Sequence, residues 1–307
     1  MSVRVVLLGG TDLTIAVANS ISDHLVGVLT VPAELKISYS PGGLRPTRAA
    51  DVAGWAASRG IRWAEWQGAA QSADFLSSLG ADWALAVGWY FLLPATMINL
   101  FPFGCGGIHA SLLPRYRGNA PLNWAIINGD TEAGVSLFRL TAGTDEGPLY
   151  GQEVIPITPR TTITELVAAT DAATMRLVSR AIQDLDSGRV ETTAQVGDVS
   201  YTLARVPDDG RINWASPARA IDRLVRASTR PYPGAFTLLD GAPVRVWSGE
   251  AVDVPRVFGA CGQLWHHNAG MFVVTGEALF RIDEATSLDG VDARPFLRKS
   301  SRRRFDT

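Results

Sequence analysis

The chain of 307 residues is 47% hydrophobic and 19% charged, with a formal net charge of −2. This is the composition of a globular protein that is long enough for two domains and a large core. The near-neutral charge excludes an overall basic field that would attract nucleic acid. The two cysteines, Cys105 and Cys261, exclude a disulfide framework and the usual thiolate metal sites, so we expect a cytoplasmic protein without a metal.

Short apolar runs alternate with helical patterns over the first part of the chain. The first run, Val3–Leu8, is too short for a signal peptide or a membrane span and predicts a strand. The further predictions, in chain order, are a helix to about Ser22, a strand over Leu25–Thr30, a helix over Val52–Arg59, a strand starting at Ile61–Trp63 and a strand over Trp83–Val87. This alternation predicts an α/β fold with a mostly parallel sheet.

Later segments are predicted from breakers and periodicity. Pro41–Pro46 is predicted to be a loop because of its Pro and Gly residues. Thr161–Leu185 has apolar residues at helical spacing and is predicted to be the last helix of a first domain, with Gly188 as its stop. The pattern then changes to short strand-like runs, which predict a small β-barrel or sandwich: Ala235–Leu239, Val244–Val246, Gly270–Val274 and Ala278–Ile282.

His109 stands at the end of a predicted strand, and a carboxylate, Asp145, follows in the Gly-flanked loop Gly143–Gly147. Active sites of open parallel sheets collect at such strand ends. A carboxylate that fixes the tautomer of an imidazole and raises its basicity suits general acid–base catalysis. From spacing alone, a catalytic pair and a structural histidine are equally open. Cys105 could form a nucleophile pair with His109, although a buried cysteine fits this apolar segment better.

An ordered set of motifs resembles the 10-formyltetrahydrofolate-dependent formyltransferases, which include methionyl-tRNA, glycinamide ribonucleotide and sugar N-formyltransferases. The motifs are His109–Gly118, Ala120–Pro121, Trp124–Ile126, Asn128–Val135 and Asp145 with Gly147, followed by Asp208–Trp214 and Pro231–Phe236. The resemblance covers nearly the whole chain. It implies a Rossmann-like catalytic domain over 1–190 and an OB-like β-barrel domain over 200–307.

The resemblance also implies a site and a co-substrate. His109 would handle the proton and donate to the oxyanion during transfer from 10-formyltetrahydrofolate, and Asp145 would be its partner. The residues expected to contact the folate are Val87, Gly88, Trp89, Tyr90, Phe91, Leu92, Ser111, Leu113, Pro114, Leu140, Thr141 and Gly143. No metal is expected to take part.

One position departs from the family pattern. The family has an Asn two residues before the histidine, and this chain has Gly107. Losing such an oxyanion donor typically costs ~10²–10³ in rate. The site could be active, with stabilisation from protonated His109, a backbone N–H, or the amide of Asn119 or Asn123. It could instead act slowly on an unusually nucleophilic acceptor, or no longer transfer formyl at all.

The charge distribution bears on the acceptor. Residues 1–199 hold 13 basic and 18 acidic side chains, a net of −5, and residues 200–307 hold 15 and 12, a net of +3. Because phosphate contacts need basic side chains, we favour a small-molecule amine, either a nucleotide-linked amino sugar or an N-hydroxyornithine-type siderophore precursor. Transfer RNA is the second option. Hydrolysis of formyl-folate and non-catalytic folate binding are the alternatives to transfer, and no membrane partner is expected.

Overall fold

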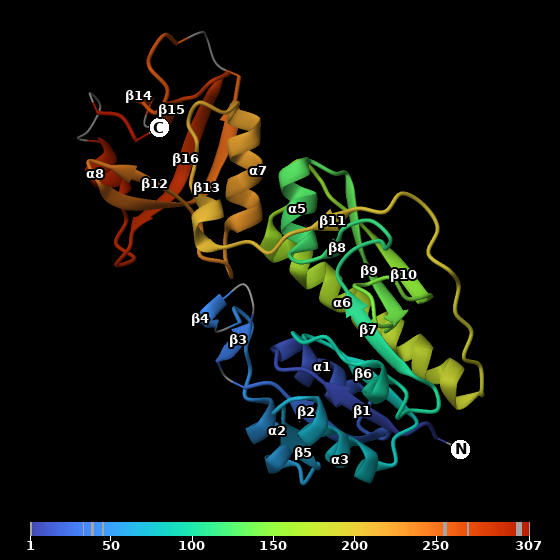
Figure 1. Cartoon of the computed structure of the whole chain (residues 1–307). Helices are drawn as coiled ribbons and strands as arrows, with labels where there is room; N and C mark the ends of the chain where they lie inside the picture. Colours follow the sequence, from blue (N-terminus) through green and yellow to red (C-terminus); the bar gives the residue numbers. More distant parts are fainter. Residues whose placement is uncertain are drawn as a thin grey trace. The chain divides into compact units, whose positions relative to one another are not determined.

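Figure 1 shows the computed structural model of the chain, which describes residues 2–32, 34–37, 40–44, 46–253, 257–268, 270–298 and 303–306. The chain packs as two compact units. Unit 1 contains Met1–Pro121, Ala133–Pro156 and Ala168–Ala204, and unit 2 contains Leu122–Glu132, Ile157–Val167 and Arg205–Thr307. Unit 2 therefore includes two short stretches that precede its main segment and lie between segments of unit 1. The expected domains 1–190 and 200–307 stay a prediction.

Unit 1 is built on a seven-stranded sheet with the strand order β10-β9-β7-β6-β1-β2-β5. Its strands are β1 (Val5–Leu8), β2 (Leu25–Thr30), β5 (Trp63–Glu65), β6 (Trp83–Ala86), β7 (Cys105–His109), β9 (Glu132–Arg139) and β10 (Leu149–Pro156). Neighbours from β7 to β5 are parallel, and β9 is antiparallel to β7. All residues of β1 and β6 are buried, as expected for parallel strands covered on both faces. The predicted mostly parallel α/β sheet is confirmed.

Among the described residues, five helices accompany the strands of this sheet, and the sequence predicts the first, the second and the last of them. They are α1 (Asp12–Ser20), α2 (Val52–Ser58), α3 (Ala69–Leu79), α4 (Ala95–Ile98) and α6 (Ile163–Asp186), of which α6 runs through both units. Thr11 accepts a hydrogen bond from the Thr14 backbone at the start of α1, and Gly80 ends α3 in the left-handed conformation; both are favourable helix termini. Leu76 and Met97 pack from α3 and α4 into the core beside β1 and β6.

The loop predicted over Pro41–Pro46 is wrong over most of its length. Strand β4 (Ser40–Leu44) pairs antiparallel with β3 (Leu35–Ile37), whereas Arg45 lies outside the described residues. In a two-stranded ribbon each strand is an edge, where a proline that cannot donate to a ladder is tolerated. The breakers therefore fit a short ribbon as well as they fit a loop.

Unit 2 has a five-stranded antiparallel sheet in the order β12-β13-β16-β15-β14 (Figure 1). Its strands are β12 (Ala235–Leu239), β13 (Ala242–Val252), β14 (Leu264–His267), β15 (Gly270–Val274) and β16 (Leu279–Ser287), and its helices are α5 (Pro121–Asn128), α7 (Ala218–Ser228), α8 (Arg294–Arg298) and the 3₁₀ turn Pro207–Gly210. The predicted smaller β domain is confirmed. Closure of its sheet into an OB-like barrel stays a prediction.

A stacked pair of aromatic rings anchors the core of unit 2. Trp214 and Phe305 are fully buried and stack with ring centroids 5.3 Å apart. The Trp214 indole N–H donates to Thr237 Oγ1 at 2.9 Å, which satisfies the one polar group that this large side chain brings into the core. Phe305 thereby fixes the end of the chain into unit 2.

Candidate active site

The site of unit 1 forms where three loops approach strand β7. Val87–Leu92 follows β6, and Ser111–Pro114 follows β7. The third loop, Leu140–Gly147, starts beside the beginning of β7, where the Leu140 N–H donates to the Cys105 carbonyl at 2.7 Å. It then returns to the other end of β7, which brings Asp145 to His109.

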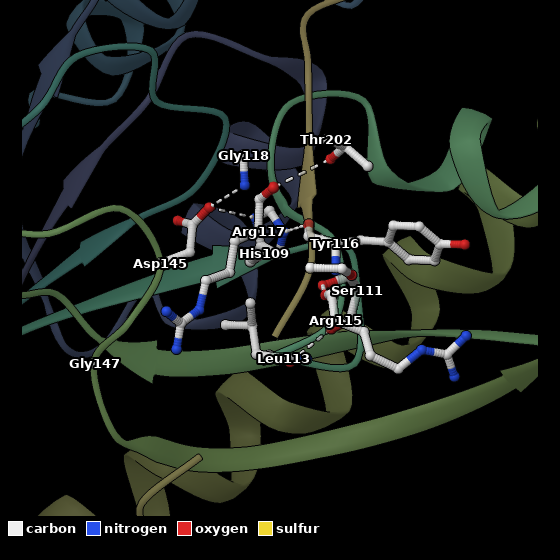
Figure 2. A network of polar contacts seen from close by, with 12 residues as sticks. His109, Ser111, Leu113, Arg115, Tyr116, Arg117, Gly118, Asp145, Gly147 and Thr202 are labelled. Atoms are coloured by element: carbon white, nitrogen blue, oxygen red, sulfur yellow. Dashed lines mark hydrogen bonds and ion pairs between the residues drawn. The ribbon is translucent and has the colours of Figure 1, made fainter. Parts of the chain in front are cut away.

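His109 and Asp145 are brought together as the sequence predicts. His109 Nδ1 lies 3.4 Å from Asp145 Oδ2, and the histidine side chain is 9% exposed. The other ring nitrogen, Nε2, lies 2.7 Å from the carbonyl oxygen of Tyr116. Figure 2 shows the imidazole between these two oxygens. Both neighbours are acceptors, so a doubly protonated ring matches them, whereas a neutral imidazole has only one N–H to offer.

Backbone and side-chain donors hold Asp145 in place. Its carboxylate accepts the Gly118 N–H at 2.8 Å (Figure 2). Its backbone has φ of +52°, a left-handed conformation that costs energy in a residue other than glycine. The Gln195 amide donates to the carbonyls of Asp145 and Gly147 at 2.7 and 2.8 Å. A Cβ on Gly147 would meet the Arg139 carbonyl oxygen at 1.7 Å, so only glycine fits at that turn.

The turn after β7 is held by a buried hydroxyl. Ser136 Oγ on β9 donates to the Ser111 carbonyl at 2.6 Å and accepts the Leu113 N–H at 3.1 Å. The Gln152 amide donates to the Leu113 carbonyl and to Ser136 Oγ, both at 2.9 Å. The Leu113–Pro114 peptide is cis. The hydrogen bonds from Ser136 and Gln152 hold the turn that contains the expected contact residues Ser111, Leu113 and Pro114 in one conformation close to His109.

The space beside Gly107 is filled by apolar side chains. Gly107 and His109 are two residues apart on β7, so their side-chain positions lie on the same face of the sheet. A Cβ at Gly107 would lie 2.7 Å from Leu140 Cδ2 and 3.1 Å from Phe138 Cε1. Leu140, which the sequence placed among the folate contacts, thus occupies the position that an amide side chain would need.

Three other groups were weighed from the sequence, Cys105 as a nucleophile and Asn119 and Asn123 as amide donors. Burial raises the pKa of the Cys105 thiol to about 12, so the thiolate that a nucleophile needs does not form near neutral pH. One N–H of the Asn123 amide donates to the Ala227 carbonyl at 2.7 Å within unit 2. Asn119 is exposed.

The loop after β6 carries an aromatic cluster. Trp66 packs edge-on against Trp89 with centroids 5.2 Å apart and stacks on Phe91 at 5.4 Å. Val87 is buried and its carbonyl accepts from Thr14 Oγ1 at 2.7 Å, Gly88 has φ of +64°, and Leu92 is 75% exposed. Tyr90 and Gly143 lie on the same two loops as Trp89 and Thr141.

Two of the expected folate contacts have buried polar atoms without a partner. Trp89 Nε1 and Thr141 Oγ1 make no hydrogen bond within the part of the chain that the structure describes. Buried polar groups are nearly always paired in folded proteins, so each such atom calls for an explanation. A polar ligand that reaches these loops would provide one.

The comparisons with known proteins identify the family. The formyl transferase family model matches residues 17–182, and the model of the formyl transferase C-terminal domain matches residues 206–299. The chain belongs to the formyl transferase family. The resemblance drawn from the sequence motifs is confirmed at this level.

Known proteins that this chain resembles fall into several groups. The chain is 38% identical over 175 residues to a methionyl-tRNA formyltransferase of Sorangium cellulosum, a match that covers 57% of this chain and 56% of the relative. The chain thus spans little more than half the length of such relatives, 56% and 58% for two of them. The described part of the chain has no helix long and apolar enough to cross a membrane, and its residues form no group of three or more potential metal ligands.

Solved structures of low identity share the fold. An N-formyltransferase from Helicobacter canadensis, in complex with folinic acid and dTDP-3-aminofucose, has a TM-score of 0.68 at 15% identity and covers 91% of this chain and 98% of its own. HypX from Aquifex aeolicus, in complex with tetrahydrofolic acid, has a TM-score of 0.65 at 14% identity and covers 96% of this chain and 47% of its own.

Several residues that build the candidate site were not predicted from the sequence. Gln195 lies in a polar connector 50 residues after Asp145, and Gln152 and Ser136 are ordinary strand residues. The Tyr116 carbonyl and the Gly118 N–H are backbone groups, which no side-chain pattern marks. The pairing of β8 (Arg117–Gly118) with β11 (Tyr201–Thr202) brings this connector beside the turn.

Proposed function

We propose that the chain is a folate-dependent N-formyltransferase that moves the formyl group of 10-formyltetrahydrofolate to the amine of a small molecule. The observation that carries the proposal is the pair of buried His109, at the end of β7, and partly buried Asp145. Membership of the formyl transferase family supports the reaction class. The unpartnered atoms of Trp89 and Thr141 support a polar ligand at the adjoining loops.

The reaction forms a C–N bond to the acceptor amine and breaks the bond between the formyl carbon and N10 of the folate. One proton must leave the amine and one must reach N10, so that the protons balance. His109 is proposed to handle this proton and to donate to the oxyanion that develops on the formyl oxygen. Asp145 holds the ring, and the Gly118 N–H and Gln195 hold Asp145.

The filled space beside Gly107 supports a larger share for His109 in the proposed stabilisation of the oxyanion. No amide can reach the oxyanion from position 107, because Gly107 has no side chain and Leu140 occupies its place. A protonated imidazole is a charge-assisted donor, which is stronger than a neutral amide. An acceptor that is more nucleophilic than an ordinary amine, such as a hydroxylamine, would also suit a site with one donor fewer.

A methionyl-tRNA acceptor is the second candidate, because relatives at 38% and 37% identity carry that name. The net charge of −5 over residues 1–199 disfavours it, since binding to a phosphate backbone depends on basic side chains.

The experiment that tests the function is an acceptor screen. The protein is incubated with 10-formyltetrahydrofolate and, separately, with a nucleotide-linked amino sugar, N5-hydroxyornithine or methionyl-tRNA, and products are read by mass spectrometry. Formylation of one small amine supports the proposal, and formylation of the tRNA alone selects the second candidate. Formate release without acceptor, or no product with any acceptor class, overturns the assignment as a transferase.

A further inference from the structure

Unit 2 contains a cavity of about 350 Å³ whose lining residues all belong to this unit. The lining comes from the end of α5, the segment 157–160 before α6, one face of α7 and the end of β13. Ligand pockets range upward from roughly 300 Å³, so this volume suits a small metabolite. None of the residues around His109 takes part in it.

A buried ion pair on α7 forms the floor of the cavity. Asp222 and Arg226 are one helical turn apart, and each is 8% exposed. Arg226 Nε donates to Asp222 Oδ2 at 2.9 Å, and its Nη1 donates to the Thr161 carbonyl at 2.7 Å. These hydrogen bonds hold Arg226 and the Asp222 carboxylate in place, and Asp222 Oδ2 already accepts a hydrogen bond.

The second oxygen of Asp222 is buried and has no hydrogen-bond partner among the described residues. Nη1 of Arg160 lies 3.5 Å from this oxygen and 3.7 Å from Glu250 Oε1, and the Arg160 side chain is 55% exposed. Arg160 Nη1 thus lies between the carboxylates of Asp222 and Glu250 and makes no hydrogen bond to Asp222 Oδ1 or to Glu250 Oε1. A buried carboxylate oxygen without a donor favours a ligand that brings an N–H group to it.

Two arginines with only long polar contacts, Arg219 and Arg223, line the solvent-facing rim of the cavity. Arg219 is 82% exposed, and its nearest carboxylate oxygen, on the 90% exposed Asp253, is 4.0 Å away. Arg223 lies against the backbone at Gly129 and donates to the Asn128 carbonyl at a long 3.4 Å. Neither guanidinium has a carboxylate closer than 4.0 Å among the described residues, and the planar fork of arginine suits phosphate or carboxylate.

We propose that this cavity binds a small molecule that carries both an amine and an anionic group. The ammonium of the ligand donates to Asp222 Oδ1 at the floor, and its phosphate or carboxylate pairs with Arg219 and Arg223 at the rim. The floor offers one buried carboxylate oxygen without a hydrogen-bond donor and the rim offers two guanidinium groups, so a ligand with both an ammonium and an anion satisfies more of the site than a simple anion or a simple amine. The site does not depend on formyl transfer, and its occupant is separate from the folate of unit 1.

Isothermal titration calorimetry of the full chain tests this site. The probe is O-phosphoethanolamine, which joins an ammonium to a phosphate, and ethanolamine and inorganic phosphate serve as half-probes. The variants are Arg219→Gln with Arg223→Gln, and Asp222→Asn. Arg211→Gln is the control, because Arg211 is an exposed arginine of unit 2 that does not line the cavity.

Saturable binding of O-phosphoethanolamine is expected, and the arginine pair and Asp222→Asn should each weaken it about tenfold or more, while Arg211→Gln leaves it unchanged. Inorganic phosphate should bind more weakly, with no effect of Asp222→Asn. Because Asp222 also holds Arg226, circular dichroism checks its variant, and the exposed arginine pair carries the test independently. The proposal is overturned if O-phosphoethanolamine does not bind, which would indicate a water-filled cavity, or if it binds equally to the arginine-pair variant.

Discussion

Filling the space beside Gly107 should destabilise unit 1 in a way that depends on Leu140. In Gly107→Asn the new Cβ would lie 2.7 Å from Leu140 Cδ2 and 3.1 Å from Phe138 Cε1, so the leucine must move. Overpacking of this kind costs about 1–3 kcal/mol. At ~2–4 °C per kcal/mol for a domain of this size, the melting temperature should fall by roughly 2–12 °C.

A double-mutant cycle isolates the contact. Leu140→Ala removes the obstructing side chain, so Gly107→Asn should cost less in that background, with a coupling of about 1 kcal/mol or more between the two positions. The assay is urea unfolding of the four proteins followed by circular dichroism. The double variant should also transfer formyl faster than Leu140→Ala alone, because an amide then faces the site. Strictly additive unfolding free energies would refute the claim that Leu140 occupies the place of the missing amide.

Three further predictions concern the surroundings of the site. Gln195→Ala removes the donor to the Asp145 and Gly147 carbonyls. It should lower kcat and should lower the unfolding free energy of unit 1 by about 1–3 kcal/mol. An unchanged Tm and kcat would show that these two hydrogen bonds do not position Asp145. Burial raises the pKa of the Cys105 thiol to about 12, so Cys105 should resist iodoacetamide at pH 8 in the native protein while the less buried Cys261 reacts. Equal labelling of the two cysteines, measured by mass spectrometry, would contradict this. The hydrogen bond from Arg176 lowers the pKa of Glu153, so the ionised carboxylate stabilises the fold above the ordinary pKa of 4.5, and this stabilisation is lost as pH falls through the lower pKa of the folded state. The Tm difference between wild type and Glu153→Gln should therefore shrink in acid. A Tm difference that stays constant with pH would contradict this role of Glu153.

The sequence predicted the parts of the site that local motifs encode. His109 ends a strand and Asp145 sits in a Gly-flanked loop, and the structure places them 3.4 Å apart. The supporting contacts could not be predicted, because they join residues far apart in sequence or use backbone groups. Gln195 reaches Asp145 across 50 residues, and the Tyr116 carbonyl leaves no trace in side-chain patterns.

Position 107 shows the limit of motif reasoning. The glycine indicated a missing amide, but only the packing shows that Leu140 and Phe138 occupy its place. Chain organisation has a similar limit. Helical periodicity located α6 closely. The hydrogen bond from Asn123 to Ala227 shows that α5 packs in unit 2, which depends on tertiary contacts that local sequence patterns do not encode.

The proposed function rests on His109, which is proposed to handle the proton during formyl transfer, and on Asp145, which holds its ring. The most direct measurement is the transfer rate of His109→Ala and Asp145→Asn with 10-formyltetrahydrofolate and the acceptor found in the screen, alongside the Kd for tetrahydrofolate of each variant. The account predicts that kcat falls by ~10²–10⁴ while folate binding persists. Folded variants that bind folate and transfer formyl at the wild-type rate would contradict it.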